Sequence, residues 1–242
     1  MADRATIEEI VRRLARAYGP LRVPQGGPPL DELVLTILSQ HTSDANAERA
    51  FTALRARFPS WESVLGARET TLAATIRSGG LANVKAKRIR AVLREVLDRR
   101  GGLDLGFLAD LPDGEVFDFL ATLPGVGPKT AAVVMAFSLG RDTIPVDTHV
   151  HRVTTRLGLV PAKATAVKAQ ALLEASVPTR LKTRFHVGLI AHGRKTCDAQ
   201  RPRCDDCVLL DLCPAGPRIG RASAVKGSTG KRSRRAKGSR SG

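Results

Sequence analysis

The sequence has few cysteines and aromatic residues, and it lacks a long apolar run. Its 242 residues contain four Cys, seven Phe, one Trp and one Tyr. No apolar run approaches the ~20 residues of a membrane-spanning helix, and no basic amphipathic helix has an aromatic face. Charged residues are interleaved through residues 1–18, so no apolar leader is expected. These absences predict a globular, cytoplasmic protein with no membrane partner.

The sequence also lacks the two-residue alternation of apolar and polar side chains that is typical of half-buried strands. Apolar residues instead recur three and four positions apart, which predicts helices, and Gly, Pro and Asp gather between these segments. A capping box at Thr6-x-x-Glu9 predicts the start of the first helix. The chain is expected to be all-α, with further helices at 30–38, 45–58, 70–76, 85–97, 115–123, 129–139, 148–157, 164–175 and 181–194.

Positive charge exceeds negative charge, and the excess is unevenly placed. The formal net charge is +16, and residues 217–242 hold nine Lys and Arg without a single acid. This excess favours a polyanionic partner, with nucleic acid ahead of an acidic membrane surface. The segment 217–242 has too few apolar side chains to fold. We expect a disordered basic tail that attracts phosphate without reading sequence, with a merely solubilising end as the alternative.

The four cysteines lie close together near the C-terminus, as Cys197-x6-Cys204-x2-Cys207-x5-Cys213. In a reducing compartment such thiols are free for a metal rather than paired in disulfides. The two-residue gap between Cys204 and Cys207 is as common in zinc sites as in iron–sulfur sites. The gaps of six and five residues on either side are wider than those of the usual zinc knuckle. The spacing predicts a metal centre and leaves zinc and iron–sulfur open.

One connection between predicted helices is rich in glycine and proline. Residues 123–130 read LPGVGPKT, in which both glycines can take positive φ, Val126 can enter the core and Pro128 suits the first position of a helix. The amides of Gly125, Gly127 and Lys129 are then free at a helix N-terminus, where a phosphate oxygen fits. This pattern predicts a sequence-independent phosphate contact, with a plain connector as the alternative.

Together these features resemble the endonuclease III family of helix-hairpin-helix DNA glycosylases and AP lyases. The likeness rests on the hairpin at 123–130, the loop IPVDTHVHRV at 144–153 and the cysteine ladder, whose gaps match the family's 4Fe-4S ligands. Residues 37–44 and 80–86 resemble the family's first and second loops. The resemblance implies two helical lobes with a DNA-binding cleft between them, and a monomer. The helical barrel with the hairpin would span 22–141, and the iron–sulfur cluster domain 1–21 and 142–216.

The same resemblance assigns the chemistry to Lys129 and Asp147. Lys129 matches the family's nucleophile, and the positive end of a helix dipole favours its free amine. That amine can attack C1′ of a damaged nucleotide, expel the base and promote β-elimination through a Schiff base. Asp147 matches a carboxylate that stabilises the positive charge developing on the sugar. Because it precedes a predicted helix, Asp147 is also expected to be an N-cap.

The resemblance further implies which residues contact DNA. His41 stands where relatives often place a glutamine that fills the vacated base stack, and this departure alters which orphan bases the side chain could hydrogen-bond. Leu81 stands where an apolar wedge parts the opposite strand, with an ordinary loop-to-helix anchor as the alternative. The expected DNA-binding set is completed by Gln40, Gly125, Gly127 and Thr148, and the cluster ligands are Cys197, Cys204, Cys207 and Cys213.

The implied function is base excision repair of duplex DNA that contains oxidised pyrimidines or abasic sites, by a cytoplasmic, nucleoid-associated enzyme. The adenine-specific mismatch branch carries a glutamate ahead of the first loop and lacks the lysine. This chain has Leu35-Thr36 there and has Lys129, so a lyase-competent enzyme fits better. A non-catalytic helix-hairpin-helix module and an iron–sulfur electron carrier remain as alternatives from other classes.

Overall fold

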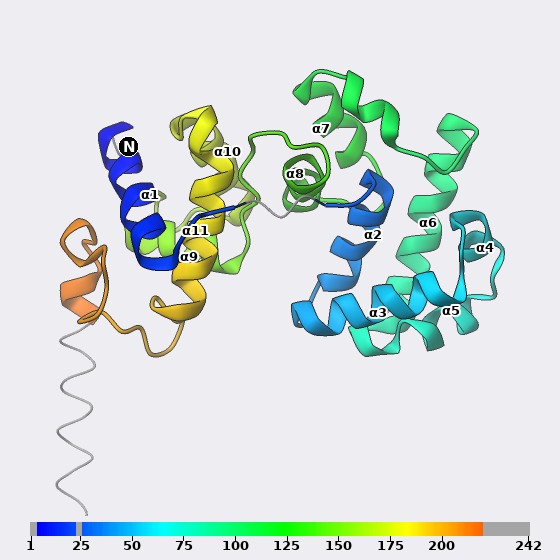
Figure 1. The fold of residues 1–242 in the computed structure, drawn as a ribbon, viewed down its shortest axis with the longest axis horizontal. Helices are drawn as coiled ribbons and strands as arrows, with labels where there is room; N and C mark the ends of the chain where they lie inside the picture. The colour runs from blue at the N-terminus through cyan, green and yellow to red at the C-terminus, as the bar shows by residue number, and fades with distance from the viewer. Residues whose placement is uncertain (1–3, 23–25, 220–242) are drawn as a thin grey trace, which may run out of the picture. The chain divides into compact units, whose positions relative to one another are not determined.

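The computed structural model describes residues 4–22 and 26–219, and within these two ranges the chain is helical with no strand (Figure 1). The all-α prediction is confirmed. The α-helices are α1 (Arg4–Tyr18), α2 (Pro29–Ser39), α3 (Asp44–Arg57), α4 (Trp61–Gly66), α5 (Glu69–Thr75), α6 (Ala82–Arg100), α7 (Asp113–Ala121), α8 (Pro128–Phe137), α9 (Thr148–Arg156), α10 (Ala166–Ser176) and α11 (Lys182–Lys195). Short 3-10 helices are η1 (Arg77–Gly79), η2 (Gly106–Asp110), η3 (Thr179–Leu181) and η4 (Leu210–Leu212).

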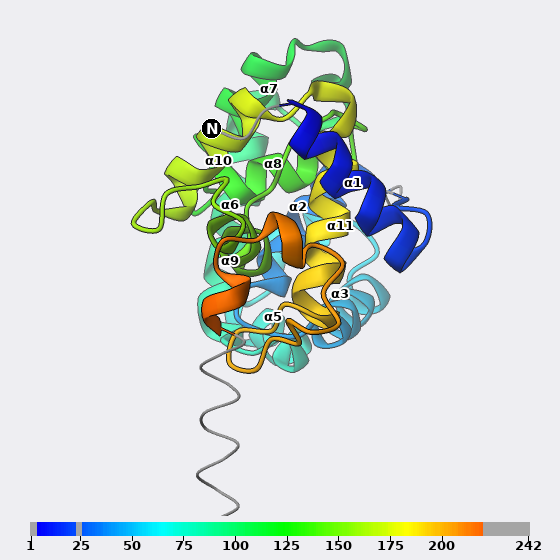
Figure 2. The same ribbon diagram turned by 90° about the vertical axis from the view of Figure 1, so that its left-hand side faces the viewer.

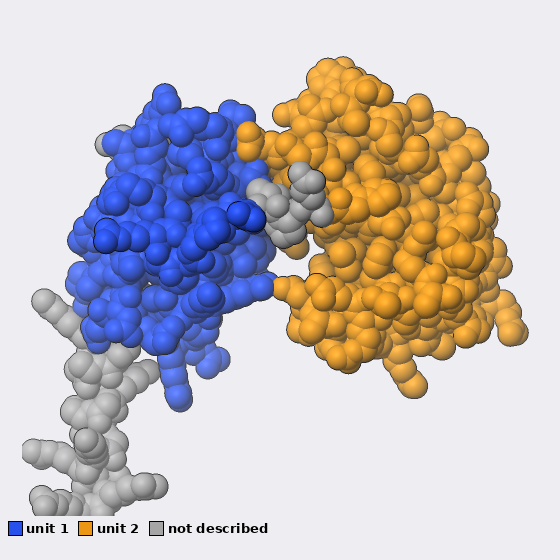
Figure 3. Space-filling model, viewed as in Figure 1, with its two compact units in different colours: residues 1–22, 146–242 blue, residues 23–145 orange. Residues whose placement is uncertain are grey.

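The chain forms two compact units, shown in separate colours in Figure 3. One unit comprises residues 1–22 and 146–242, and the other comprises residues 23–145. The first unit is therefore discontinuous in sequence. The assignment of the predicted barrel and cluster domains to these units stays a prediction.

The unit of residues 23–145 is built around α2. This helix is apolar on most sides, with Leu33, Val34, Ile37 and Leu38 fully buried, and it packs against α3, α6 and α8. A helix with so wide an apolar surface is stable only when neighbours cover it. The end of α2 is consequently held firmly in the core, next to the loop that carries Gln40 and His41.

The unit of residues 1–22 and 146–242 packs α1 against α11 and α11 against α9, as the turned view in Figure 2 shows. The apolar face of α1 presents Ile7, Ile10 and Leu14, all nearly inaccessible to solvent. Gly188 of α11 permits a close approach, since a Cβ there would lie 3.0 Å from a methyl carbon of Leu14.

Several sequence-based expectations are corrected by the structure. Helix α1 already includes Arg4, so Thr6 lies inside the helix and is not its N-cap. Helix α4 was not expected at all. Residues 216–219 are helical, with the Ile219 amide donating to Ala215 O at 3.1 Å, so the predicted disordered tail cannot begin at residue 217. The rest of that predicted tail, residues 220–242, lies outside the described residues.

None of the described helices is both long and apolar enough to cross a membrane.

Candidate active site and metal centre

The glycine-rich connection between α7 and α8 forms a tight turn. Gly125 has a φ of +71°, which favours glycine, whereas Gly127 has a φ of −94° and serves as the N-cap of α8. The expectation of two positive-φ glycines is therefore wrong for Gly127. Val126 is 5% exposed and anchors the turn in the core, and Pro128 occupies the first turn of α8 as predicted. Its missing amide hydrogen removes a donor that would have no intrahelical partner.

The amides at this turn are placed to meet an anion. Gly125 and Gly127 are exposed, and the Lys129 amide belongs to the first turn of α8, where backbone donors lack intrahelical acceptors. The positive end of the helix dipole adds to the attraction. Phosphate binding at this turn stays a prediction.

Lys129 lines a pocket of about 190 Å³ between α2, α3 and α8. Lys129 is half-buried, so its side chain is partly withdrawn from bulk water. Three carboxylates share the pocket wall: Glu32 from α2, and Asp44 and Glu48 from α3. The pocket therefore brings one amine and three acids together within the unit of residues 23–145.

Glu32 is the half-buried acid of this set and was missed by the sequence analysis. Its Oε1 accepts a hydrogen bond from the Thr36 hydroxyl at 3.4 Å. Burial raises the pKa of Glu32, while the Thr36 hydrogen bond and the charge of Lys129 act in the opposite direction. The i, i+4 spacing of Glu32 and Thr36 on one helix face was the available signal, because residues four apart on a helix are neighbours.

His41 and Leu81, the two expected DNA-inserting residues, share an unusual backbone conformation. Their φ values are +55° and +47°, and they are the only non-glycine residues with positive φ in the described ranges. Both side chains are exposed, Leu81 by 57%. Each loop thus holds a bulky side chain outward at a backbone position that normally favours glycine. Their insertion into DNA stays a prediction.

A buried lysine connects the two loops. Lys85, in the first turn of α6, is 2% exposed, and its Nζ donates to Leu38 O and to Gly79 O, both at 2.7 Å. Burial, followed by the nearby charge of Arg88, lowers the pKa of Lys85. Leu38 precedes the loop of His41 and Gly79 precedes the loop of Leu81, so one ammonium group fixes the start of both.

One turn further along α6, Arg88 connects the first loop to the hairpin. Its guanidinium donates to Gln40 Oε1. It also packs against the hairpin, since a Cβ at Gly125 would lie 2.6 Å from Arg88 Nε. Gln40 and Gly125, both predicted to contact DNA, are therefore brought together by this arginine. Any larger residue at position 125 would displace it.

Asp147 is the N-cap of α9, as predicted. Its Oδ1 accepts a hydrogen bond from the Val150 amide at 2.8 Å, and Thr148 is the first residue of the helix. One carboxylate oxygen is thus committed to the backbone. Asp147 and Lys129 belong to different units, and their catalytic pairing stays a prediction.

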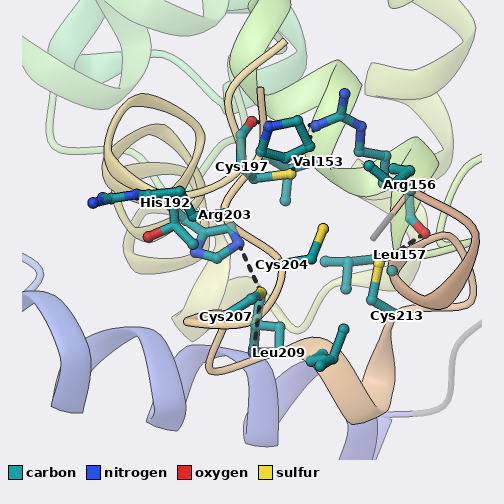
Figure 4. A pocket seen from close by; sticks show the side chains of 15 residues that line it. Val153, Arg156, Leu157, His192, Cys197, Arg203, Cys204, Cys207, Leu209 and Cys213 are labelled. Carbon is teal, nitrogen blue, oxygen red and sulfur yellow. Dashed lines mark hydrogen bonds between the residues drawn. The ribbon is translucent and has the colours of Figure 1, made fainter. Parts of the chain in front are cut away.

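The four cysteines line a single pocket in the unit of residues 1–22 and 146–242 (Figure 4). All four are free thiols of intermediate exposure. Burial, as the largest cause, raises the pKa of Cys207 to about 11, and the charges of the other cysteines add to this rise. Four thiolates in one cavity repel each other, so they need a cationic group between them.

Hydrogen-bond donors surround these thiols. Arg156 Nη1 lies 3.2 Å from Cys197 Sγ, and the Leu209 amide donates to Cys207 Sγ at 3.4 Å. Burial lowers the pKa of His192 to about 4, so its imidazole is neutral. One ring nitrogen, Nε2, lies 3.6 Å from Cys207 Sγ, and the other, Nδ1, lies 2.8 Å from the Tyr18 hydroxyl. Such contacts orient the ligands of a metal centre and tune its charge.

The cysteine pocket suits a thiolate-bound metal centre, because all four thiols line one cavity. The choice between zinc and an iron–sulfur cluster at this site stays a prediction. A 4Fe-4S cluster binds four cysteine thiolates, and the four cysteines around this cavity fit that requirement.

The hairpin, the lysine pocket and the cysteine loop define a helix-hairpin-helix protein of the DNA glycosylase class. The chain belongs to the HhH-GPD superfamily of base excision DNA repair proteins, whose family model matches residues 34–179. The resemblance to this superfamily is confirmed, and the chain is a base-excision DNA glycosylase and lyase of the endonuclease III kind.

Individual relatives agree with this membership. The chain is 33% identical over 207 residues to endonuclease III of Haemophilus influenzae, covering 86% of this chain and 93% of that protein. It is 38% identical over 190 residues to an Arabidopsis thaliana protein named "Putative DNA glycosylase", covering 75% of this chain and 65% of that protein. A solved non-covalent endonuclease III–DNA complex superimposes with a TM-score of 0.79 at 29% identity, covering 91% of this chain and 100% of that one.

Proposed function

We propose that the protein removes oxidised pyrimidines from duplex DNA and then nicks the strand by β-elimination, with Lys129 as the nucleophile. The observation that carries the proposal is the position of Lys129 in the first turn of α8, directly after the hairpin and in the wall of a pocket. A solved relative, at 29% identity and a TM-score of 0.78, is a trapped covalent intermediate of endonuclease III with DNA. Covalent attachment through an amine is therefore a reasonable chemistry for this chain.

The steps follow from the chemistry of a primary amine. The Lys129 Nζ lone pair attacks C1′ of the extruded nucleotide, and the bond between C1′ and the damaged base breaks, so the base leaves with that electron pair. The sugar ring then opens to a Schiff base, which acidifies the C2′ proton. Loss of this proton expels the 3′ phosphate and leaves a nicked strand.

Asp147 is proposed to stabilise the positive charge that develops on the sugar as the base departs. One of its oxygens already accepts the Val150 amide, which fixes the side-chain orientation and leaves the second oxygen for the sugar. The N-cap role and the catalytic role are therefore compatible. The amides of Gly125 and Gly127, with Gln40, His41, Leu81 and Thr148, are proposed to contact duplex DNA that contains a damaged base or an abasic site.

The cysteine pocket is proposed to hold a 4Fe-4S cluster through Cys197, Cys204, Cys207 and Cys213. When bound, the cluster supplies the positive charge that four neighbouring thiolates require, and it orders the loop from Cys197 to Cys213. Arg156, the Leu209 amide and His192 then contact the ligand sulfurs and hold their orientation.

Borohydride trapping tests the lysine chemistry. Wild-type protein is incubated with duplexes that each contain one oxidised pyrimidine, and a covalent protein–DNA adduct is expected after reduction. The Lys129→Gln variant should give no adduct and no nick, because its side-chain amide is not a nucleophile. Lys163→Gln, at an exposed lysine outside the pocket, is the control and should react as wild type does.

Nicking that survives in Lys129→Gln would remove Lys129 from its role. The absence of any wild-type adduct on every oxidised base tried, together with tight duplex binding, would instead favour a non-catalytic binding module.

A further inference from the structure

The lysine pocket contains an acid that the proposed mechanism has not used. Lys129 must lose a proton before its lone pair can attack C1′, and an exposed carboxylate is a weak base for this purpose. Asp44 and Glu48 are both exposed, whereas Glu32 is half-buried in the pocket wall. Glu32 is thus the acid whose surroundings differ most from water.

Glu32 is hydrogen-bonded at one carboxylate oxygen, and the other lies close to a neighbouring backbone segment. Oε1 accepts the Thr36 hydroxyl at 3.4 Å. Oε2 lies against Gly26, where an added Cβ would come within 2.9 Å of it. The Gly26 amide donates to Phe137 O at 2.6 Å and so fixes this segment to the end of α8, the helix that carries Lys129. The carboxylate is consequently packed into a site and not free to sweep through solvent.

From this geometry we propose that Glu32 is the acid–base partner of Lys129, an inference that rests on the proposed glycosylase and lyase function. Ionised Glu32 accepts one proton from the Lys129 ammonium, directly or through one water, and the freed Nζ lone pair forms the bond to C1′. As the bond between C1′ and the base breaks, the departing base takes the proton from Glu32. Glu32 ends ionised, the positive charge stays on the Nζ now bonded to C1′, and the proton leaves with the base.

The electrostatics of the pocket agree with this role. Burial raises the pKa of Glu32, which makes the ionised form a stronger base than an ordinary carboxylate. Three charged side chains share the pocket with Glu32: Lys129 on α8, and Asp44 and Glu48 on α3. On α6, which also packs against α2, Lys85 donates to backbone carbonyls and Arg88 donates to Gln40. On its own helix, Asp31 accepts the Trp61 indole N–H at 3.0 Å.

The test measures how fast the amine attacks an abasic duplex, because no base has to be expelled there. Adduct formation is followed with cyanoborohydride from about pH 6 to about pH 10 for wild type, Glu32→Gln and Glu48→Gln. Glu48→Gln removes a carboxylate from the same pocket and is the matched control. Glu32→Asp keeps the acid but shortens it by one methylene group, and its rate should lie between those of wild type and Glu32→Gln.

The expected result is a pH-dependent loss. Glu32→Gln should react at least about tenfold more slowly than wild type near pH 7 and approach the wild-type rate at high pH, where solvent deprotonates the lysine. The wild-type rate should fall as the pH drops through the raised pKa of Glu32, since the protonated acid cannot accept a proton. Glu48→Gln should follow the wild-type profile.

Three other outcomes would overturn the inference while leaving the lysine chemistry in place. A faster Glu32→Gln near neutral pH would mean that Glu32 only stabilises the ammonium form of Lys129. An unchanged profile would mean no role, and an equal loss at every pH would mean a structural one. If wild type forms no adduct at all, the proposed function and this inference both fail.

Discussion

Replacing Leu81 by glycine removes the exposed side chain of the second loop while the loop can keep its backbone conformation. Leu81 has φ and ψ of 47° and 38°, and it is 57% exposed. A non-glycine residue in this left-handed conformation costs about 1–2 kcal/mol, and the extra freedom of glycine in the unfolded chain costs about 0.5–1 kcal/mol. Losing the covered part of the side chain costs ~1 kcal/mol, because a fully buried leucine contributes about 1.5–3 kcal/mol. These effects nearly cancel, so the free energy of unfolding should change by less than about 1 kcal/mol.

Excision should respond differently from stability. If the exposed part of Leu81 is buried between bases when the lesion is extruded, it contributes about 1–1.5 kcal/mol, which corresponds to a change in rate by a factor of about 5–13. Leu81→Gly should therefore lower the single-turnover rate of excision from a duplex with one oxidised pyrimidine by that factor. Leu81→Asn is a second variant, since Asn tolerates the left-handed conformation but offers no apolar wedge.

Two results would contradict this reasoning. A loss of about 2–5 kcal/mol in urea unfolding, as for a buried leucine, would make Leu81 an ordinary anchor between loop and helix. Unchanged excision together with unchanged stability would show that no wedge acts at this position.

Two further predictions concern buried polar contacts. Lys85→Met should lower the free energy of unfolding, measured by urea titration, by about 2–3 kcal/mol. The reason is that the carbonyls of Leu38 and Gly79 lose a charged donor at 2.7 Å. An unchanged midpoint of urea unfolding would contradict this prediction. Arg156→Met removes the donor to Cys197 Sγ and to Asp198 O, so iron should pass to a chelator faster than in wild type. Equal release rates, or a colourless wild-type protein that contains zinc, would count against the cluster assignment.

Within the described residues, the helical period located every α-helix except α4. Segments 30–38, 45–58 and 129–139 correspond to α2 (Pro29–Ser39), α3 (Asp44–Arg57) and α8 (Pro128–Phe137). Helix α4 has six residues, fewer than two turns, so no apolar period could develop; the available signal was Ser60, which caps it. Thr6 misled because a threonine three residues before a glutamate has the same spacing inside a helix as at its start.

The candidate site was predictable where a motif is local and was missed where the fold creates it. The turn around Gly125 and the N-cap at Asp147 depend on neighbouring residues, so the sequence alone predicts them. Glu32 and Lys129 are far apart in the chain and meet only because α2 packs against α8. Likewise, nothing in the sequence around Lys85 indicates burial, because its partners are carbonyls of two other segments.

Helix α9 connects the proposed catalytic carboxylate of Asp147 with the segment that carries the cysteines. Asp147 caps its N-terminus, and its Arg152 and Arg156 donate to the backbone oxygen of Cys197 at 3.0 and 3.4 Å. The nine-residue helix that Asp147 caps therefore also anchors the start of the cysteine-containing segment. A substitution at either arginine would loosen that segment from the helix that presents the proposed catalytic carboxylate.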